Sequence, residues 1–209
     1  PSGPHDLWSS VDVLGSHLIA VHCTHLEELD LDLIAQNEVR VVLNPESNMK
    51  LASGIAPISQ LLEKGVTVGL GTDGCASNNN LDLFTEMDTA AKLHKVHTLD
   101  PTLLDAWTVL KMATIEGARA LGLSEEIGSL KPGKKADIIV MDTHKPHLTP
   151  MYNPYSHLVY AAKGSDVSHS IINGQVLLED GRLTQMDLQS VMEAAKGEAK
   201  RVQAWTSKT

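Results

Sequence analysis

Apolar residues in the first part of the chain gather in short runs that do not alternate with polar ones. Strands buried on both faces of a parallel sheet have this pattern, because neither face meets water. Helical spacing separates the runs, and the order strand, helix, strand, helix, strand is typical of a parallel β/α fold. The predicted strands are residues 17–21, 39–43 and 66–70, and the helices between them are residues 27–36 and 57–64.

Helical spacing continues after the third run. Asn80 can cap a helix that extends to about Lys95, with Met87 and His94 among the residues at helical spacing. Two further helices are predicted over residues 102–112 and 114–121, the second ending before a glycine. The pattern up to about residue 125 therefore predicts one β/α domain.

The pattern changes near residue 126. A Pro-Gly turn leads into a predicted strand at residues 136–141, and Asn173-Gly174 lies between apolar flanks, which is a strong hairpin signal. The tail from Asp187 to Trp205 has amphipathic helical spacing, and we expect its apolar side to pack on the body of the protein. We therefore predict three parts: residues 1–125, a small β unit at 126–183 and a C-terminal helix at 184–209.

Composition and charge narrow the class of protein. The chain is 42% hydrophobic and 21% charged, which is typical of a soluble globular protein, and no apolar run approaches the ~20 residues of a membrane span. A formal net charge of -9 disfavours nucleic acid as a partner. Cys23 and Cys75 are far apart and lack C-x-x-C spacing, so a reducing cytoplasm is expected. Pro1 in place of Met favours a chain that begins within a longer protein.

Residues 69–74 (GLGTDG) fit two different chemistries. Their glycines have the G-x-G-x-x-G spacing of a dinucleotide-binding turn. That turn requires a helix that begins at the third glycine and an acidic residue at the end of a second strand about 20 residues later. The residues after Gly74 predict a polar loop, and Glu86 and Asp88 lie within a predicted helix. The dinucleotide interpretation is therefore the weaker of the two.

The second interpretation is that Asp73 is a functional carboxylate. It directly follows a buried strand, where barrel enzymes place metals and general bases. Taken alone, Asp73 is equally consistent with a residue that orders its own loop. However, His22 follows the first apolar run and Asn44 follows the second. Three strands are thus expected to deliver Asp, His and Asn to one edge of the sheet.

Four motifs along the chain carry a resemblance to a known family: AVHCTHLEE, NPESNMKLASGIAPI, GLGTDGCASNNNLDLFTEM and GSLKPGKKADIIVMD. In this order they resemble the carboxyl-terminal half of the amidohydrolase superfamily, closest to the triazine chlorohydrolase-like group that includes S-adenosylhomocysteine and 5'-methylthioadenosine deaminases. The resemblance covers nearly the whole chain. It implies an α/β fold with a partial (β/α)8 TIM-type barrel, about the last three β/α units, plus part of a small flanking β-sandwich and a C-terminal helix.

The resemblance also implies a reaction. In such enzymes a divalent metal, usually zinc and in some cases iron, lowers the pKa of a bound water to about 7, and the resulting hydroxide attacks an amino-bearing ring carbon. Asp73 would ligate the metal and move a proton from the water to the leaving ammonia. His22 would hydrogen-bond to the hydroxide. Ser77 and Asn44 would contact the substrate, an adenosine-like or other amino-substituted heteroaromatic ring.

Most of the family's metal ligands have no counterpart in this sequence. A catalytic zinc site ordinarily has three protein ligands, and the family takes two of them from an H-x-H that is absent here. His22 and His25 are expected on opposite faces of a strand, and His94 and His97 as a solvated pair. We therefore expect a fragment that lacks the metal and is inactive alone.

Alternatives to the deaminase interpretation differ in class. A chlorohydrolase, or a guanine or cytosine deaminase of the same superfamily, would share the Asp at the strand end. An inert oligomerising scaffold is the alternative from another class, and a dinucleotide-binding domain is the third.

A closed barrel of this kind needs eight strands and commonly about 250 residues, whereas only three such strands are predicted here. Because open sheet edges recruit other strands, we expect a homo-oligomer.

Overall fold

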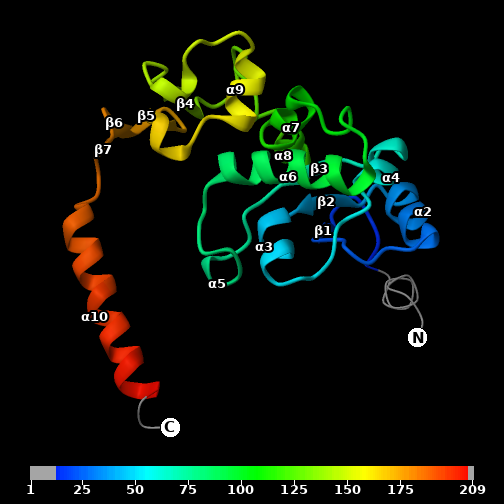
Figure 1. The fold of residues 1–209 in the computed structure, drawn as a ribbon, viewed down its shortest axis with the longest axis horizontal. Coiled ribbons are helices and arrows are strands. Elements are labelled where there is room, and N and C mark those ends of the chain that lie inside the picture. Colours follow the sequence, from blue (N-terminus) through cyan, green and yellow to red (C-terminus); the bar gives the residue numbers. More distant parts are fainter. Residues whose placement is uncertain (1–12, 207–209) are drawn as a thin grey trace. The chain divides into compact units, whose positions relative to one another are not determined.

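The computed structural model describes residues 13–206, which divide into two compact units (Figure 1). The larger unit contains the described residues up to Lys135 and the segment Thr143–Asp166. The smaller unit contains Ala136–Asp142 and the described residues from Val167 onward. The predicted boundaries at residues 125 and 183 stay predictions.

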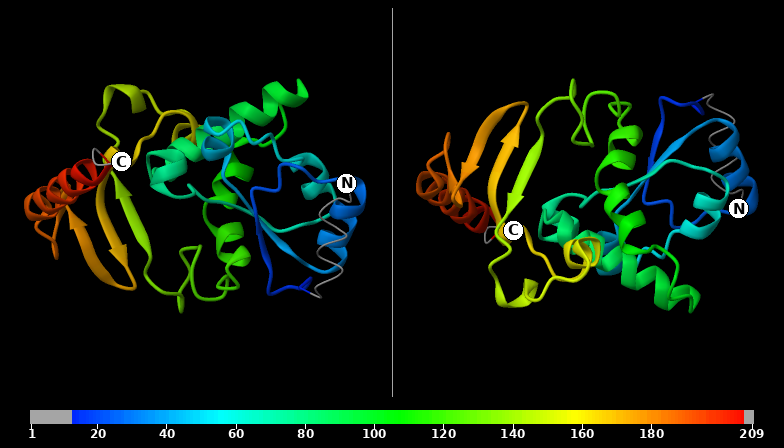
Figure 2. Two further views of the ribbon diagram at one scale, coloured as in Figure 1. Left: turned by 90° about the horizontal axis from the view of Figure 1, so that it is seen from below. Right: turned by 90° about the horizontal axis from the view of Figure 1, so that it is seen from above.

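A parallel sheet forms the centre of the larger unit, and Figure 2 shows its three strands side by side. Its strands are β1 (Ile19–Val21), β2 (Arg40–Leu43) and β3 (Val68–Leu70), and both neighbouring pairs are parallel with β2 in the middle. The sequence prediction of three parallel strands in an α/β fold is therefore confirmed. Within the described residues β1 and β3 are the edges of this sheet, and the expected homo-oligomer stays a prediction.

Helices connect and cover the strands. The predicted connections are present as α2 (Glu28–Gln36) and α4 (Ile58–Glu63), and the two predicted later helices as α7 (Ala106–Met112) and α8 (Ile115–Ala120). α7 begins four residues later than predicted, because its cap is Asp105. Apolar side chains of the strands and helices share one core, whose most buried members include Ile34, Val41, Leu43, Ile58, Leu61, Val68 and Val109. The structure adds elements that the sequence did not predict: α3 (Pro45–Lys50), α5 (Cys75–Asn78), α9 (Pro154–Tyr160) and 3₁₀ turns at Pro146–Leu148 and Gly164–Asp166.

Helix α6 (Leu83–Thr98) begins later than expected. The predicted cap, Asn80, is wrong, because the cap is Asp82, whose carboxylate accepts the Phe84 N–H at 2.9 Å. Asn80 acts one step earlier, since its Oδ1 accepts the Asp82 N–H at 2.9 Å. The helix also extends to Thr98 instead of ending near Lys95.

The smaller unit contains an antiparallel sheet of β4 (Ile138–Met141), β5 (Val167–Ile172), β6 (Gln175–Glu179) and β7 (Arg182–Leu183), in that order. β5 and β6 form the predicted hairpin, and both turn residues, Asn173 and Gly174, have positive φ as a tight two-residue turn requires.

The tail forms the predicted helix, α10 (Leu188–Thr206), but none of its side chains is buried, so the expected packing of its apolar side is not seen. None of the described helices combines the length and the apolar character needed to cross a membrane.

The prediction for His94 was wrong. His94 was predicted to form a solvated pair with His97, but it is 2% exposed and lies on the buried side of α6 with Met87, Ala90 and Ala91. Burial, and then the neighbouring His97, lower the pKa of His94 to about 4. The core of the larger unit therefore holds a neutral imidazole at neutral pH.

The buried imidazole predicts a pH dependence of folding. An unfolded histidine binds a proton below about pH 6.5, whereas folded His94 binds one only near pH 4. The stability that a neutral His94 contributes is thus fully present above pH 6.5 and is lost as the pH falls towards 4. Urea unfolding at several pH values should show a shallower loss in His94→Gln than in the unsubstituted chain. His97→Gln is the control, and an equal change in both variants would contradict this assignment.

Candidate active site

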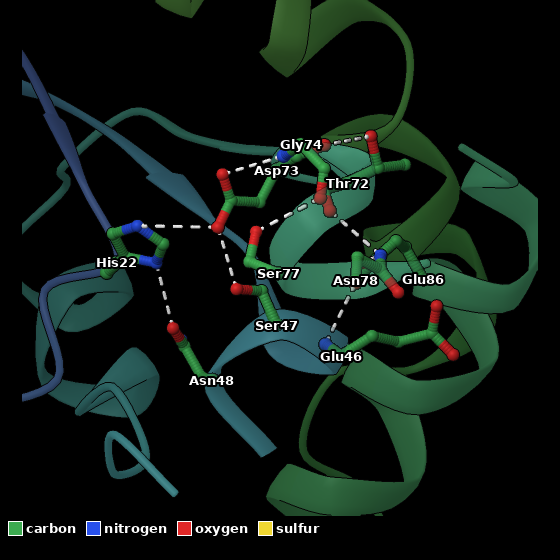
Figure 3. A network of polar contacts seen from close by, with 10 residues as sticks. All are labelled: His22, Glu46, Ser47, Asn48, Thr72, Asp73, Gly74, Ser77, Asn78 and Glu86. Carbon is green, nitrogen blue, oxygen red and sulfur yellow. Dashed lines mark hydrogen bonds and ion pairs between the residues drawn. The ribbon is translucent and has the colours of Figure 1, made fainter. Parts of the chain in front are cut away.

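The carboxyl ends of the three parallel strands place His22 and Asp73 beside each other, as the sequence predicted (Figure 3). His22 Nε2 lies 3.9 Å from Asp73 Oδ2, and the two side chains are 41% and 31% exposed. Both residues have positive φ, 68° for His22 and 59° for Asp73, a conformation that is uncommon outside glycine. The chain thus turns away sharply at the point where each side chain is presented.

The turn at His22 also shows that one prediction was wrong: His22 and His25 do not lie on opposite faces of a strand. β1 ends at Val21, and both His22 and Cys23 have positive φ, so the alternation of a strand does not extend to His25. The side chains of these two histidines are placed by the turn and not by a strand. His22 itself still takes part in the sheet, because its N–H donates to the Val42 carbonyl at 3.0 Å.

Asp73 is held as a carboxylate by donors on both of its oxygens. The Ser47 hydroxyl donates to Oδ2 at 2.7 Å, and the Gly74 N–H donates to Oδ1 at 2.7 Å. The hydroxyls of Ser47 and Ser77 and the Gly74 N–H lower the pKa of Asp73 to about 2. The group is therefore ionised at neutral pH and can accept a proton or bind a cation.

His22 is oriented by a side-chain amide. Its Nδ1 lies 2.8 Å from Asn48 Oδ1, and because a carbonyl oxygen only accepts, this nitrogen carries the proton. The other ring nitrogen, Nε2, then faces Asp73. Asn48 thus fixes which nitrogen is available for chemistry beside the carboxylate.

Two consecutive residues of α3, Ser47 and Asn48, therefore support the two candidate catalytic groups. Ser47 is 1% and Asn48 4% exposed, although both are polar. Neither residue was predicted from the sequence as part of the site. The available signal was a polar NPESN segment directly after a buried strand, and this segment forms a short helix at the same sheet edge.

Ser77 and Asn44 occupy different positions around this pair. The Ser77 hydroxyl donates to the Gly74 carbonyl at 3.0 Å within the turn that carries Asp73. Asn44 is 3% exposed, and its Oδ1 is buried with no hydrogen-bond partner in the described part of the chain. Asn44 directly follows β2, whereas Ser77 lies in α5 after the Asp73 turn. Their contact with a substrate stays a proposal.

Two of the three glycines in residues 69–74, Gly69 and Gly71, have roles in packing. A Cβ at Gly69 would lie 3.1 Å from the Gly117 backbone in α8, and a Cβ at Gly71 would lie 3.1 Å from Asn44 Nδ2. Gly74 directly precedes α5, so the predicted polar loop after it is wrong. The second dinucleotide requirement is still unmet, because the acidic residues Glu86 and Asp88 lie inside α6. Close packing thus accounts for Gly69 against α8 and for Gly71 against side chains at the end of β2, whereas a side chain at Gly74 would meet no atom within 4 Å.

The described residues contain no group of three or more His, Cys, Asp or Glu side chains that could hold a metal ion. Asp73 and His22 are only a pair, whereas a catalytic zinc ordinarily has three protein ligands. The residues present therefore do not fit a complete metal centre. Asp73 fits one ligand of such a centre, since it is ionised and accessible.

Comparison with known proteins places this site in a family. The model of the amidohydrolase family matches residues 3–177. The chain is 62% identical over 186 residues to a 5-methylthioadenosine/S-adenosylhomocysteine deaminase of Syntrophobacter fumaroxidans, covering 89% of this chain and 42% of that protein. It is 54% identical over 198 residues to a 5'-deoxyadenosine deaminase of Methanosarcina acetivorans, covering 95% of this chain and 45% of that protein.

Solved structures show the same relationship. An adenosine deaminase from Xanthomonas campestris with bound zinc is similar at a TM-score of 0.93 and 41% identity, over 96% of this chain and 46% of that one. An atrazine chlorohydrolase from Arthrobacter aurescens complexed with zinc is similar at a TM-score of 0.85 and 25% identity, over 93% of this chain and 43% of that one. The chain thus spans less than half the length of each of these four proteins.

The contacts around Asp73 predict how its acidity responds to substitution. In Ser47→Ala the pKa of Asp73 should rise towards the ordinary aspartate range, because the hydrogen bond that lowers it most is lost. Carbon-13 NMR titration of the Asp73 carboxyl measures this change. Ser77→Ala is the matched control and should raise the pKa less. An unchanged Asp73 in Ser47→Ala would show that the hydroxyl does not act on the carboxylate.

Proposed function

The chain belongs to the amidohydrolase family, and from this premise we propose that it is the carboxyl-terminal part of an enzyme that deaminates adenosine-like rings by hydrolysis. The observation that carries the proposal is the pair formed by Asp73 and His22, 3.9 Å apart at the ends of two parallel strands. Support for the substrate class comes from the relatives, several of which are named as deaminases of adenosine-like compounds. The proposed fold is three β/α units of a larger barrel, with the antiparallel sheet as part of a flanking sandwich.

The proposed reaction replaces the ring amino group by an oxygen from water. The water oxygen bonds to the ring carbon that carries the amino group while Asp73 accepts the water proton. Asp73 then gives this proton to the amino nitrogen, the carbon–nitrogen bond breaks, and ammonia leaves. Asp73 is ionised and so can accept this proton, but the donors that lower its pKa to about 2 also make it a weak base, so the first step would need a water whose own pKa a metal has lowered.

His22 is proposed to form a hydrogen bond to the attacking water. Asn48 holds its Nδ1, so Nε2 is directed to the space beside the Asp73 carboxylate. With the proton on Nδ1, Nε2 of the neutral ring is an acceptor, so it can receive a hydrogen bond from the attacking water and hold that water in position. Ser77 and Asn44 are proposed as substrate contacts, since Ser77 lies in α5 directly after the Asp73 turn and Asn44 directly follows β2.

A divalent metal, with zinc as first choice, is proposed for the intact protein. Two similar solved structures are described with zinc. The described residues of this chain supply Asp73 and no group of three ligands, so the remaining ligands would come from other parts of the intact protein. The 209-residue chain alone is therefore proposed to bind no stoichiometric metal and to be inactive.

A chlorohydrolase is the second candidate, favoured by the structural similarity to atrazine chlorohydrolase at a TM-score of 0.85. Identity favours the deaminase, because it is 62% with the Syntrophobacter fumaroxidans deaminase and 25% with the chlorohydrolase. Assays with both substrate classes separate these candidates, since one releases ammonia and the other chloride.

Metal content tests the proposed incompleteness of the site. Plasma mass spectrometry on the purified 209-residue chain should find much less than one zinc per chain, and assays with 5'-methylthioadenosine and S-adenosylhomocysteine should show no ammonia release. The physical reason is that fewer than three ligands do not hold a catalytic zinc. One zinc per chain together with turnover would overturn this part of the proposal.

A chimera tests whether this chain carries working catalytic groups. The chain would replace the matching 42% of the Syntrophobacter fumaroxidans relative, which is 62% identical over that region. The chimera should release ammonia from 5'-methylthioadenosine, and Asp73→Asn should lower kcat by about 10³-fold, because an amide cannot accept the proton. His22→Asn should lower kcat by about 10²-fold.

The control in the chimera is Asp32→Asn. This carboxylate forms an ion pair with Lys64 and lies outside the proposed site, so its loss should leave kcat nearly unchanged. A folded chimera with no deaminase activity, or an Asp73→Asn chimera that keeps full activity, would refute the proposed function.

A further inference from the structure

A second carboxylate, Glu86 of α6, lies behind the candidate site and is completely buried. Its Oε1 accepts a hydrogen bond from Asn78 Nδ2 at 2.7 Å, and its Oε2 accepts the Glu46 N–H at 3.2 Å. Burying a carboxylate is costly unless donors compensate for lost water. Here each oxygen has one donor, and the donors come from two different segments, α5 and α3.

Both donors are next to residues of the candidate site. Asn78 Nδ2 also donates to the Thr72 carbonyl at 2.8 Å, so Glu86 is connected to the residue directly before Asp73. Glu46 directly precedes Ser47, whose hydroxyl donates to Asp73. Figure 3 shows the contacts that reach Asn78, Thr72 and Glu46 and, separately, those of Ser47 and Gly74 with the Asp73 carboxylate; the backbone joins the two sets.

Glu46 extends the network on its other side. Its Oε2 accepts from Asn80 Nδ2 at 3.0 Å, and its Oε1 lies 3.4 Å from the Thr89 hydroxyl of α6. The first turn of α3 is therefore tied to α6 by its backbone and by its side chain.

We propose that Glu86 is a positioning residue that holds α3 and the Asp73 turn at the separation where the Ser47 hydroxyl and the Gly74 N–H both reach the Asp73 carboxylate. This inference rests on the proposed function, which assigns the proton transfer to Asp73. Glu86 itself does not touch the candidate site; it acts through Asn78 and through the backbone of Glu46.

The chemistry of the two donors explains why a carboxylate is needed at this position. Glutamine would offer one acceptor oxygen and one amide donor, so either Asn78 or the Glu46 N–H would face another donor. Burial raises the pKa of Glu86 to about 7, and the negative charges of Glu46 and Asp73 act in the same direction, while the two hydrogen bonds oppose it. An apolar residue would remove the connection altogether.

Amide NMR on the 209-residue chain tests the inference without metal or substrate. In Glu86→Gln the Gly74 amide proton should move upfield, because its hydrogen bond to the Asp73 carboxylate is weakened. The Glu46 amide should exchange about tenfold faster, as expected when a buried hydrogen bond is lost. Val41, in the centre of the sheet, should keep its shift, which separates local positioning from a general loss of structure.

Asp88→Asn is the matched control, since this carboxylate is on the same helix but pairs with Lys92 outside the network. In Asp88→Asn the chemical shift of the Gly74 amide proton should not change. If Glu86→Gln fails to fold, Asn78→Ala removes the hydrogen bonds of Asn78 to Glu86, to Thr72 and from Asn80 but keeps the bond from the Glu46 N–H to Glu86. The Gly74 amide should then move while the Glu46 amide does not. An unmoved Gly74 amide in a folded Glu86→Gln or Asn78→Ala chain, or an equal movement in Asp88→Asn, would overturn the inference.

The outcomes of this test and of the chimera are independent. If the chimera is inactive but Glu86→Gln changes the chemical shift of the Gly74 amide, the proposed function is refuted and the positioning role of Glu86 is supported. An active chimera with an unmoved Gly74 amide would refute the positioning role alone. In an active chimera, Glu86→Gln should lower kcat with little change in KM, because Glu86 does not contact the substrate.

Discussion

Parallel pairing of three strands is the constraint on which the candidate site depends. Backbone hydrogen bonds continue past the strands, from His22 N–H to the Val42 carbonyl and from Gly71 N–H to the Leu43 carbonyl. These bonds fix where the chain leaves the sheet, and positive φ at His22 and Asp73 turns it away immediately. The side chains at the strand ends thus share one edge because the sheet is parallel, whatever their chemistry.

The strands themselves could be predicted from the sequence, because a buried parallel strand needs an apolar side chain at nearly every position. Helix α3 could not, since its segment PESNMK has no apolar periodicity. Ser47 and Asn48 are buried there because they donate to Asp73 and accept from His22, partners that are 26 residues away in each case. Burial that is caused by distant polar partners leaves no hydrophobic pattern to detect.

Other differences between sequence and structure have similarly local causes. Asn80 and Asp82 are both good capping residues, and only the contact between them decides that the helix begins after Asp82. His94 and His97 are three residues apart, yet only His94 shares the side of the helix that carries Met87, Ala90 and Ala91. The candidate pair Asp73 and His22 was accessible to prediction because its position depends on the sheet, whereas its supporting residues depend on the packing of short helices.

Two carboxylates close to one another in this structure illustrate how environment assigns different roles to the same chemical group. Asp73 is partly exposed and surrounded by hydroxyl and N–H donors, which lower its pKa to about 2. Glu86 is cut off from water, and burial raises its pKa to about 7 although it has two donors. The first arrangement keeps a charge available to a substrate or a cation, and the second holds a charge-bearing group where no ligand reaches it. Glu86 contributes through the hydrogen bonds that it accepts from Asn78 and from the Glu46 N–H. These bonds connect the segment that follows Asp73 with the helix that carries Ser47.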